Sequence, residues 1–320
     1  MQWQILNMAD TSWCPEVLDI LKPYAQIITL KPSRQALLDN ISQVDVYIAS
    51  LYVQCDSEIL NKATRLRAIV TPSTGTDHID IEAATKKNIK ILSLKNDTEF
   101  LDSITATAEL TWALLLATIR RLPWAFEAAK AGWWARDRFR GHQLAGKTLG
   151  ILGYGRLGRI VGQYGNAFRM NVITCDIRKK LNVDEFVQQV DFDTLLRQSD
   201  ILSIHIHLTE KNKHLINADA FSKMKSQAVL INTSRGAIID EQALLNALRS
   251  NKIAGAGLDV ITGEWNENLE QHPLIRYAKT HENLLISPHI GGVTYESQKM
   301  TLEFIIRKLV KFIEENDVQQ

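Results

Sequence analysis

Three side chains with the chemistry of an acid–base site follow predicted strands in the second half of the chain. Arg235 ends the run Ile-Asn-Thr-Ser-Arg, Glu264 follows Leu-Asp-Val-Ile-Thr-Gly, and His289 stands in Ser-Pro-His-Ile-Gly-Gly. An arginine fork can bind a carboxylate through two hydrogen bonds, and a histidine can exchange a proton near neutral pH. A glutamate beside that histidine would favour the protonated ring and fix its orientation. Each residue type alone is common on protein surfaces, but their shared position after strands predicts one site that orients a carboxylate and moves a proton.

A glycine-rich turn lies upstream of these three residues. The run Gly-Tyr-Gly-Arg-Leu-Gly follows a predicted strand and opens a predicted helix. Gly153 permits the tight turn, Gly155 lets the backbone approach a pyrophosphate, and Gly158 allows the helix to pack closely on the strand. We expect the N–H groups of Arg156 and Leu157 to face the phosphates, with the helix dipole behind them. The pattern predicts a dinucleotide-binding site.

Asp176 follows the next predicted strand, about 20 residues past the glycines, as this motif requires. A carboxylate there can accept hydrogen bonds from the adenosine ribose and would repel a 2′-phosphate, which favours NAD over NADP. Arg178, Lys179 and Lys180 come directly afterwards and could neutralise an additional phosphate. The alternative is that these three cations form a solvated loop.

The whole chain alternates short β-branched runs with helical patterns. This alternation predicts an α/β fold with parallel sheets covered by helices on both faces, in two doubly wound units. The expected strands are 3–6, 27–30, 44–48, 67–71, 89–92, 148–152, 171–175, 200–208, 228–233, 254–259 and 284–287. The expected helices include 15–22, 34–40, 56–62, 80–87, 103–122, 217–225, 240–251 and 294–316.

Two further segments are candidates for binding. The polar loop at 71–80 follows a strand, so the backbone N–H groups of Ser73, Thr74 and Gly75 could hold a small anion. The alternative is a capped turn, with Asp77 or Asp80 at the start of the next helix. After the helix at 103–122, which we expect Pro123 to stop, the segment 124–140 is rich in Trp and Arg. Such clusters are enriched in interface cores, which predicts a dimer contact, although packing within one subunit remains the alternative.

Composition excludes several other classes of protein. The chain has 320 residues and a net charge of +1, so it offers no strong field for nucleic acid or membrane surfaces. Its longest apolar run, 110–119, is too short to span a bilayer. Cys14, Cys55 and Cys175 form no C-x-x-C pair and indicate free thiols without a metal site. With no signal-peptide pattern at the start of the sequence, we expect a cytoplasmic protein.

The order of these motifs resembles the D-isomer-specific 2-hydroxyacid dehydrogenases. The resemblance rests on Gly-x-Gly-x-x-Gly, Asn-Thr-Ser-Arg-Gly, Leu-Asp-Val with a Glu five residues after the Asp, and Pro-His-Ile-Gly-Gly, in that order. It implies a Rossmann-type NAD-binding domain at 101–290, with a dimerisation arm at about 103–140. That domain would be inserted into a flavodoxin-like substrate domain formed by 1–100 and 291–320.

The resemblance also implies roles for individual residues. Arg235 would bind the substrate carboxylate, His289 would be the general acid in reduction and the general base in oxidation, and Glu264 would orient His289. Asp259 would contact the nicotinamide side of the cofactor, and Thr233 and Ser234 would line the same pocket. The expected cofactor is NAD, the substrate is a small D-2-hydroxy acid or 2-oxo acid, and the partner is a second copy of the chain.

The sequence also departs from the family pattern. Trp265 and His207 stand where the family usually has proline, and 49–52 replaces a segment in which phosphoglycerate-oxidising members carry an arginine. A phosphorylated substrate would therefore need another cation, such as Arg65 or Lys95. Four readings stay open: a phosphoglycerate dehydrogenase-like enzyme, a hydroxypyruvate or glyoxylate reductase, an NADH-sensing regulatory protein on the same scaffold, and an enzyme of the same fold that oxidises formate or phosphite.

Overall fold

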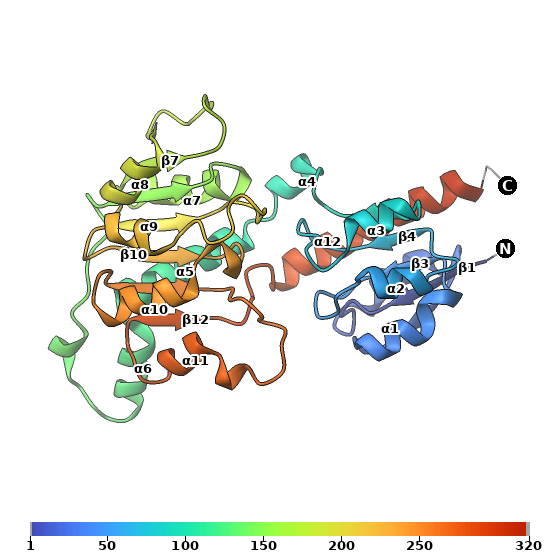
Figure 1. The fold of residues 1–320 in the computed structure, drawn as a ribbon, viewed down its shortest axis with the longest axis horizontal. Coiled ribbons are helices and arrows are strands. Elements are labelled where there is room, and N and C mark those ends of the chain that lie inside the picture. The colour runs from blue at the N-terminus through green and yellow to red at the C-terminus, as the bar shows by residue number, and fades with distance from the viewer. Residues whose placement is uncertain (1, 318–320) are drawn as a thin grey trace. The chain divides into compact units, whose positions relative to one another are not determined.

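The structure, a computed structural model, describes residues 2–317 in two compact units (Figure 1). Unit 1 consists of Met1–Ser103 and Thr294–Gln320, and unit 2 is Ile104–Val293. The sequence placed the corresponding boundaries at 100–101 and 290–291. Residue 1 and residues 318–320 of the expected substrate domain lie outside the described residues.

Unit 1 is built on a five-stranded parallel sheet with the strand order β2-β1-β3-β4-β5. The strands are β1 Trp3–Asn7, β2 Ala25–Thr29, β3 Val46–Ile48, β4 Ala68–Val70 and β5 Lys90–Leu92. This is the flavodoxin-like order of a doubly wound fold, as expected from the sequence. In such a fold, ligands bind beyond the carboxyl ends of the strands.

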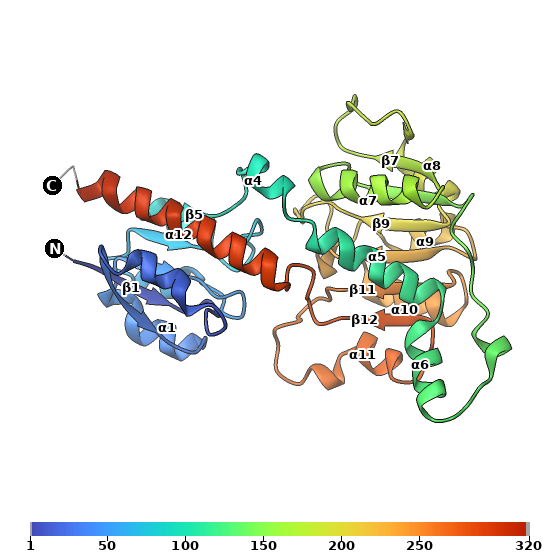
Figure 2. The same ribbon diagram turned by 180° about the vertical axis from the view of Figure 1, so that it is seen from behind.

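Helices cover both faces of this sheet. They are the 3-10 helices η1 Pro15–Leu21 and η2 Ile41–Gln43, and the α-helices α1 Arg34–Asn40, α2 Ser57–Lys62, α3 Ile81–Lys86, α4 Thr98–Asp102 and α12 Tyr295–Asp317. The helices α1, α2 and α3 lie on one face, and α12 lies on the other (Figures 1 and 2). α12 buries Leu302, Ile305, Ile306, Leu309 and Ile313 in the core of unit 1. The last helix of the chain therefore completes the unit that the first hundred residues begin.

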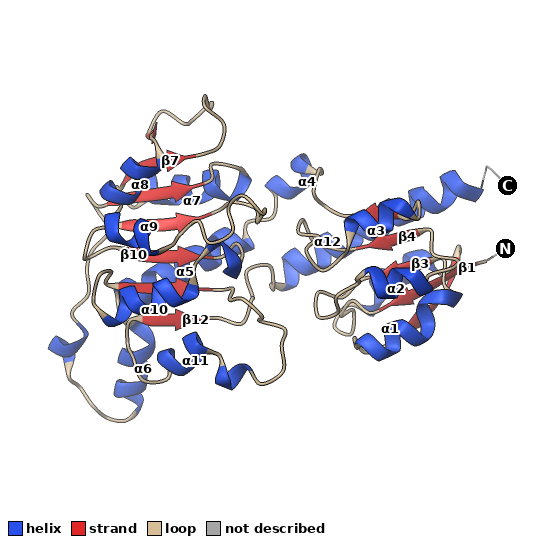
Figure 3. Ribbon diagram, viewed as in Figure 1, coloured by secondary structure: helices blue, strands red, loops and turns tan. Residues whose placement is uncertain are grey.

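Unit 2 contains a seven-stranded parallel sheet with the order β12-β11-β10-β9-β6-β7-β8. Its strands are β6 Thr148–Leu152, β7 Asn171–Cys175, β8 Val187–Gln189, β9 Ile201–Ile204, β10 Val229–Asn232, β11 Gly255–Leu258 and β12 Leu284–Ile286 (Figure 3). Counted from β6, this is the Rossmann order with one more strand at the edge. The order reverses direction at β6, the strand before the glycine turn.

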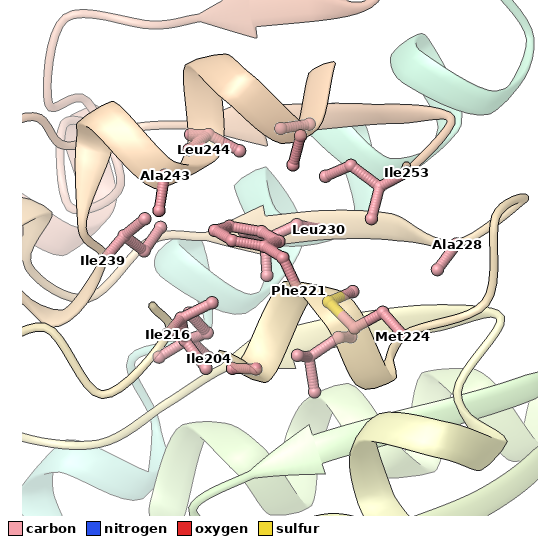
Figure 4. Close-up of a cluster of buried hydrophobic side chains, with 14 of the residues drawn as sticks. Ile204, Ile216, Phe221, Met224, Ala228, Leu230, Ile239, Ala243, Leu244 and Ile253 are labelled. Atoms are coloured by element: carbon pink, nitrogen blue, oxygen red, sulfur yellow. The ribbon is translucent and has the colours of Figure 1, made fainter. Parts of the chain in front are cut away.

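The helices of unit 2 divide between the two faces of the sheet. They are α5 Ala106–Ile119, α6 Leu122–Lys130, α7 Arg156–Ala167, α8 Phe192–Gln198, α9 Ala218–Lys223, α10 Glu241–Arg249 and α11 Pro273–Ala278, with the 3-10 helices η3 Arg136–Phe139, η4 Gly236–Ile238 and η5 Leu269–Gln271. α5 and α7 lie on one face, and α8, α9 and α10 lie on the other (Figures 1 and 2). Phe221 of α9 lies among aliphatic side chains from β9, β10 and α10 in the core under the second face (Figure 4).

The expected helix at 103–122 is wrong at both ends. Residues 104 and 105 are not helical, and α5 ends at Ile119. Arg121 then adopts a left-handed backbone with φ +55°, and Pro123 lies in the first turn of α6. Proline is favoured there because the first helical N–H groups need no partner within the helix. Pro123 therefore helps to start a helix instead of stopping one.

Smaller corrections concern other elements. The segment 15–22 forms the 3-10 helix η1 instead of an α-helix. β8, α8 and α11 were not predicted. Residues 98–119 are long and apolar enough, by length and composition, to cross a membrane, with a mean hydropathy of 1.3. In the structure this stretch is broken between α4 and α5, and α5 buries residues against β10 and β11. These observations favour a core helix.

Candidate active site

The three residues predicted for proton transfer and carboxylate binding follow three adjacent strands of unit 2. Arg235 comes after β10, Glu264 after β11, and His289 after β12, and these strands are neighbours in the sheet. Because the sheet is parallel, the three loops leave it at the same edge. The structure therefore places the three residues on adjacent loops.

The contact between Glu264 and His289 is direct. Oε1 of Glu264 lies 2.6 Å from Nδ1 of His289, and both side chains are mostly buried. The carboxylate accepts a hydrogen bond from the Nδ1–H group, which fixes the tautomer of the neutral ring. This arrangement would leave Nε2 as the nitrogen available for proton exchange.

The loop that carries Glu264 is a tight turn. The N–H of Asn266 donates to the carbonyl of Gly263 at 2.9 Å, which leaves Glu264 and Trp265 as the two central residues. Gly263 has φ +71°, and a Cβ there would lie 2.6 Å from the amide nitrogen of the Asn266 side chain. Thr262, just before the turn, donates its N–H to Glu241 of α10 at 2.6 Å. The turn is thus anchored to the body of unit 2.

Asp259 organises the loop that carries His289. Its carboxylate accepts hydrogen bonds from the Ser287 hydroxyl at 2.6 Å, from the Ile290 N–H at 2.9 Å and from the Gly291 N–H at 2.8 Å. The residue is 1% exposed, and burial raises the pKa of its carboxyl. His289 has φ +54°, a conformation that costs a non-glycine residue about 1–3 kcal/mol. The three donors from this loop help to hold it in that conformation.

Arg235 is positioned by its neighbours on the β10 loop. The side chain of buried Asn232 donates to the Arg235 carbonyl at 2.9 Å and accepts the Ser234 N–H at 2.9 Å. A Cβ on Gly236 would collide with the backbone of Ile261. The Arg235 loop therefore lies directly against the backbone that leads to the Glu264 turn.

Two hydroxyls that the sequence assigned to the cofactor pocket make contacts within the protein. The Thr233 hydroxyl bonds to that of Thr111 on α5 at 2.9 Å, and the Ser234 hydroxyl donates to the Ile204 carbonyl at 2.6 Å. These bonds tie the β10 loop to α5 and β9. His205, left out of the predicted site, is partly buried, and burial of its ring lowers the pKa of the imidazole to about 4.

The glycine turn fits a dinucleotide in its backbone geometry. Gly153 has φ +94°, and a Cβ there would lie 2.6 Å from the carbonyl oxygen of His205. A Cβ on Gly158 would collide with the Gly153 carbonyl, so both positions require glycine for internal reasons. A Cβ on Gly155, in contrast, meets nothing within 4 Å. Gly155 caps the start of α7, so this open space lies where the helix start, at Arg156, can receive a phosphate.

Leu157, in the first turn of α7, is half-buried and packs on the core of unit 2. Arg156 donates from its guanidinium to the Ile104 carbonyl at 2.5 Å. The part of these two residues that the sequence assigned to phosphate binding is their backbone, which forms the first turn of α7.

Asp176 lies at the end of β7 with its carboxylate held by Arg178. The Arg178 Nε donates to Oδ1 at 2.8 Å and its Nη2 to Oδ2 at 2.9 Å, while the Tyr154 N–H donates to Oδ2 at 2.9 Å. The Arg178 side chain lowers the pKa of Asp176 to about 2. The cation that the sequence left as a candidate phosphate ligand thus contacts the carboxylate expected to bind the ribose.

Ser73, Thr74 and Gly75 lie in unit 1, beyond the carboxyl end of β4. The Ser73 hydroxyl donates to the Gly75 carbonyl at 2.6 Å, so it closes the loop on itself. The Asp80 side chain accepts the Ala83 N–H at 2.9 Å and caps α3. Of the two residues named for the capped-turn alternative, Asp80 makes the cap, and the anion-binding role of the loop stays a prediction.

Two residues at the site were not assigned a role from the sequence. Ser287 holds Asp259, and the Trp265 ring stacks on the His289 ring with centroids 5.6 Å apart. The available signals were a serine directly before Pro-His and a tryptophan in place of the usual proline. No group of three or more His, Cys, Asp or Glu side chains that could hold a metal ion exists within residues 2–317.

Comparison with known proteins agrees with this geometry. Residues 112–291 match the family model described as D-isomer specific 2-hydroxyacid dehydrogenase, NAD binding domain. A glyoxylate reductase of Thermococcus litoralis is 37% identical over 290 residues, which cover 88% of this chain and 84% of that protein. A D-3-phosphoglycerate dehydrogenase of Methanocaldococcus jannaschii is 34% identical over 284 residues, which cover 88% of this chain but 52% of that protein.

A solved structure extends the likeness to three dimensions. The crystal structure of a glyoxylate reductase from Paecilomyes thermophila matches with a TM-score of 0.86 at 31% identity. The match covers 98% of this chain and 96% of that one.

Proposed function

This chain belongs to the D-isomer-specific 2-hydroxyacid dehydrogenases and is an NAD-dependent oxidoreductase of 2-hydroxy acids, and we propose that its substrate is a small, unphosphorylated 2-oxo acid such as glyoxylate or hydroxypyruvate. The 2.6 Å contact between Glu264 and His289, on a loop next to that of Arg235, supports the reaction, and the observation that carries the choice of substrate is the lack of a cation in 49–52. The names of the similar proteins support the reductase reading over the phosphoglycerate reading.

In this proposal Arg235, His289 and Glu264 each have a separate role in the reaction. Arg235 binds the substrate carboxylate and orients the adjacent carbonyl. Nε2 of His289 donates a proton to the carbonyl oxygen during reduction and takes it back during oxidation. Glu264 holds the ring through Nδ1 and stabilises the charged form. The glycine turn, with its open space at Gly155, would hold the pyrophosphate of NADH and Asp176 would hold its ribose, and the bound cofactor would supply the hydride.

The charges of unit 1 support an unphosphorylated substrate. The segment 49–52 has no cation, and Arg65 pairs with Asp45 at 3.0 Å. Asp45 directly precedes β3, so this pair lies at the amino ends of the strands, away from the loop that follows β4. Lys95 remains at the carboxyl edge, where the Leu94 N–H donates to the Ser73 carbonyl at 3.0 Å. Of Arg65 and Lys95, only Lys95 could therefore bind the phosphate of a phosphorylated substrate.

The test is NADH oxidation by the purified protein with glyoxylate, hydroxypyruvate, pyruvate and phosphohydroxypyruvate. We expect the highest kcat/KM for one of the two small reductase substrates. A preference for phosphohydroxypyruvate that Lys95→Ala abolishes would contradict the unphosphorylated reading. If none of the four compounds is reduced although NADH binds tightly, the result would favour the regulatory alternative.

We also propose that the chain forms a homodimer through the arm around 124–140. Trp134 is 85% exposed, and Trp133, also exposed, carries Arg138 over its ring at 4.8 Å. Aromatic and arginine side chains of this kind are enriched at interfaces. Light scattering of the wild type and of Trp134→Glu tests this: we expect a dimer that the charged variant weakens, and an unchanged mass would contradict the role of the arm.

The three cysteines support a cytoplasmic location, which we also propose. Cys14 and Cys55 are buried, Cys175 is partly buried, and all three are free thiols. Thiols of this kind persist in reducing compartments. Cell fractionation with an antibody against the chain tests the location.

A further inference from the structure

One loop contacts the His289 ring in two ways. Glu264 bonds to Nδ1 at the ring edge, and its neighbour Trp265 lies over a ring face, with 22° between the planes. The two residues are the central pair of the turn from Gly263 to Asn266. A single rigid turn therefore supplies both an edge contact and a face contact to one imidazole.

The backbone of His289 makes this support necessary. With φ +54°, the residue is held in a sparsely populated conformation. The Asp259 carboxylate holds the loop on both sides of His289, through the Ser287 hydroxyl and the Ile290 N–H. That network does not limit rotation of the ring about its own side-chain bonds. Glu264 restrains the ring at one atom only, so tilting about that hydrogen bond would still be possible without a contact on the face.

Trp265 is suited to prevent that tilt. The residue is 43% exposed, so more than half of its surface is covered within the protein even though it stands on a surface turn. The neighbouring turn residue Gly263 requires glycine, and Thr262 is bonded to α10. The indole thus rests on an anchored backbone. An offset stack of aromatic rings is favourable by about 0.5–1.5 kcal/mol beyond the area it buries.

We propose that Trp265 is a positioning residue for catalysis, whose indole ring holds the face of the His289 imidazole while Glu264 holds its edge, so that Nε2 is aimed at the substrate carbonyl. This inference rests on the proposed function for the identity of the reacting groups. It assigns the departure from the usual proline a specific purpose in this chain. A proline would leave the ring face without an aromatic neighbour.

Three variants separate the ring contact from simple bulk. Trp265→Phe keeps an aromatic ring, Trp265→Leu keeps apolar volume without one, and His289→Asn removes the partner. For Trp265→Leu we expect kcat to fall about tenfold, because small misplacements of a reacting group are costly. The Kd for NADH should stay within about twofold, since the cofactor's phosphate and ribose sites are elsewhere. Trp265→Phe should restore most of kcat.

Fluorescence provides a readout that does not depend on turnover. A protonated imidazole quenches an indole that it touches, so emission from Trp265 should fall as His289 gains a proton. The difference in emission between the wild type and Trp265→Phe isolates this residue from the other six tryptophans. We expect this difference to change with pH, and to lose that change in His289→Asn.

The outcomes are distinct. Wild-type kcat in Trp265→Leu, or equal losses in the Leu and Phe variants, would overturn the positioning role. So would a loss that appears in NADH affinity instead of kcat. If the wild type reduces no 2-oxo acid while the fluorescence change persists and depends on His289, the ring contact stands and the proposed function has failed. Thermal melts of each variant exclude loss of fold as the cause.

Discussion

Glu264 and His289 meet at 2.6 Å although they lie on separate loops that follow different strands. The pair exists because β11 and β12 are adjacent and parallel, so their carboxyl ends open at the same edge. The contact occupies Nδ1, so the proposed proton exchange falls to Nε2. Its consequences for catalysis can be measured directly.

Replacement of His289 by Ala should remove the proton donor. We expect kcat to fall by about two to four orders of magnitude, the usual contribution of general acid–base catalysis. The affinity for NADH, measured by the quenching of protein fluorescence, should be unchanged. Glu264→Gln is the companion variant, which keeps a hydrogen-bond acceptor but removes the charge. Its kcat should fall by less than that of His289→Ala. Retained turnover in His289→Ala would remove the residue from its assigned role.

The glycine turn offers a matched pair of substitutions. Gly155→Ala should leave the melting temperature nearly unchanged, because its Cβ meets nothing within 4 Å. It should weaken the binding of NADH, because the methyl group fills the space for the pyrophosphate. Gly153→Ala should lower stability, because its Cβ would lie 2.6 Å from the His205 carbonyl at φ +94°. Calorimetric titration with NADH and thermal melts measure both effects. Unimpaired NADH binding by Gly155→Ala would place the pyrophosphate elsewhere.

Asp176 should decide between the two nicotinamide cofactors. Asp176→Ala removes the acceptor for the ribose and leaves Arg178 free to meet a 2′-phosphate, so NADH affinity should fall more than NADPH affinity. Arg178→Ala is the control, since it keeps the carboxylate, and it should preserve the preference for NADH. Equal losses for both cofactors in Asp176→Ala would show that the carboxylate does not read the ribose.

The same carboxylate should contribute to acid stability. Its folded pKa, held at about 2 by Arg178, lies below the value of about 3.9 for an unfolded aspartate. The pair therefore stabilises the fold above about pH 4 and loses that contribution as the pH falls towards 2. Urea unfolding should show a larger gap between wild type and Asp176→Asn at pH 7 than at pH 3. A gap independent of pH would contradict the ion pair.

The main role of Asp259 should be to hold the conformation of the His289 loop, through the three hydrogen bonds that its carboxylate accepts. Asp259→Ala would leave Ser287, Ile290 and Gly291 without their acceptor in a buried site, and each lost partner costs roughly 1–3 kcal/mol. We expect a destabilisation of a few kcal/mol and a kcat near that of the His289 variant. Ser287→Ala removes one donor and should cause a smaller loss of both. A stable Asp259→Ala with normal kcat would show that the loop holds itself.

Much of this architecture was predictable because local patterns encode it. Alternating strands and helices gave the fold class, and the glycine run marked the turn before α7. Residues that follow strands of a parallel sheet lie at one edge, so the positions of Arg235, Glu264 and His289 after strands predicted one shared site. The order of β10, β11 and β12, which makes their loops neighbours, was not predicted. The parallel pairing of β10 with β11 and of β11 with β12 brings the three loops together.

The remaining features depend on contacts between distant residues. The bond of Arg178 to Asp176 and the stack of Trp265 on His289 follow from side-chain directions, which sequence spacing does not encode. The break between α5 and α6 depends on one left-handed residue, Arg121, in an otherwise helical pattern. β8 has the sequence Val-Gln-Gln and buries only Val187, so it lacks the apolar run by which the other short strands were predicted.

The position of α12 has a consequence for the synthesis of the protein. Residues 2–103 leave the ribosome first, yet the apolar face that α12 covers in unit 1 must wait while the roughly 190 residues of Ile104–Val293 are made. At about 5–20 residues per second, that wait lasts on the order of ten to forty seconds. Unit 2, which is continuous, can fold during this interval. The newly made chain therefore carries one finished unit and one exposed apolar face until its last helix emerges.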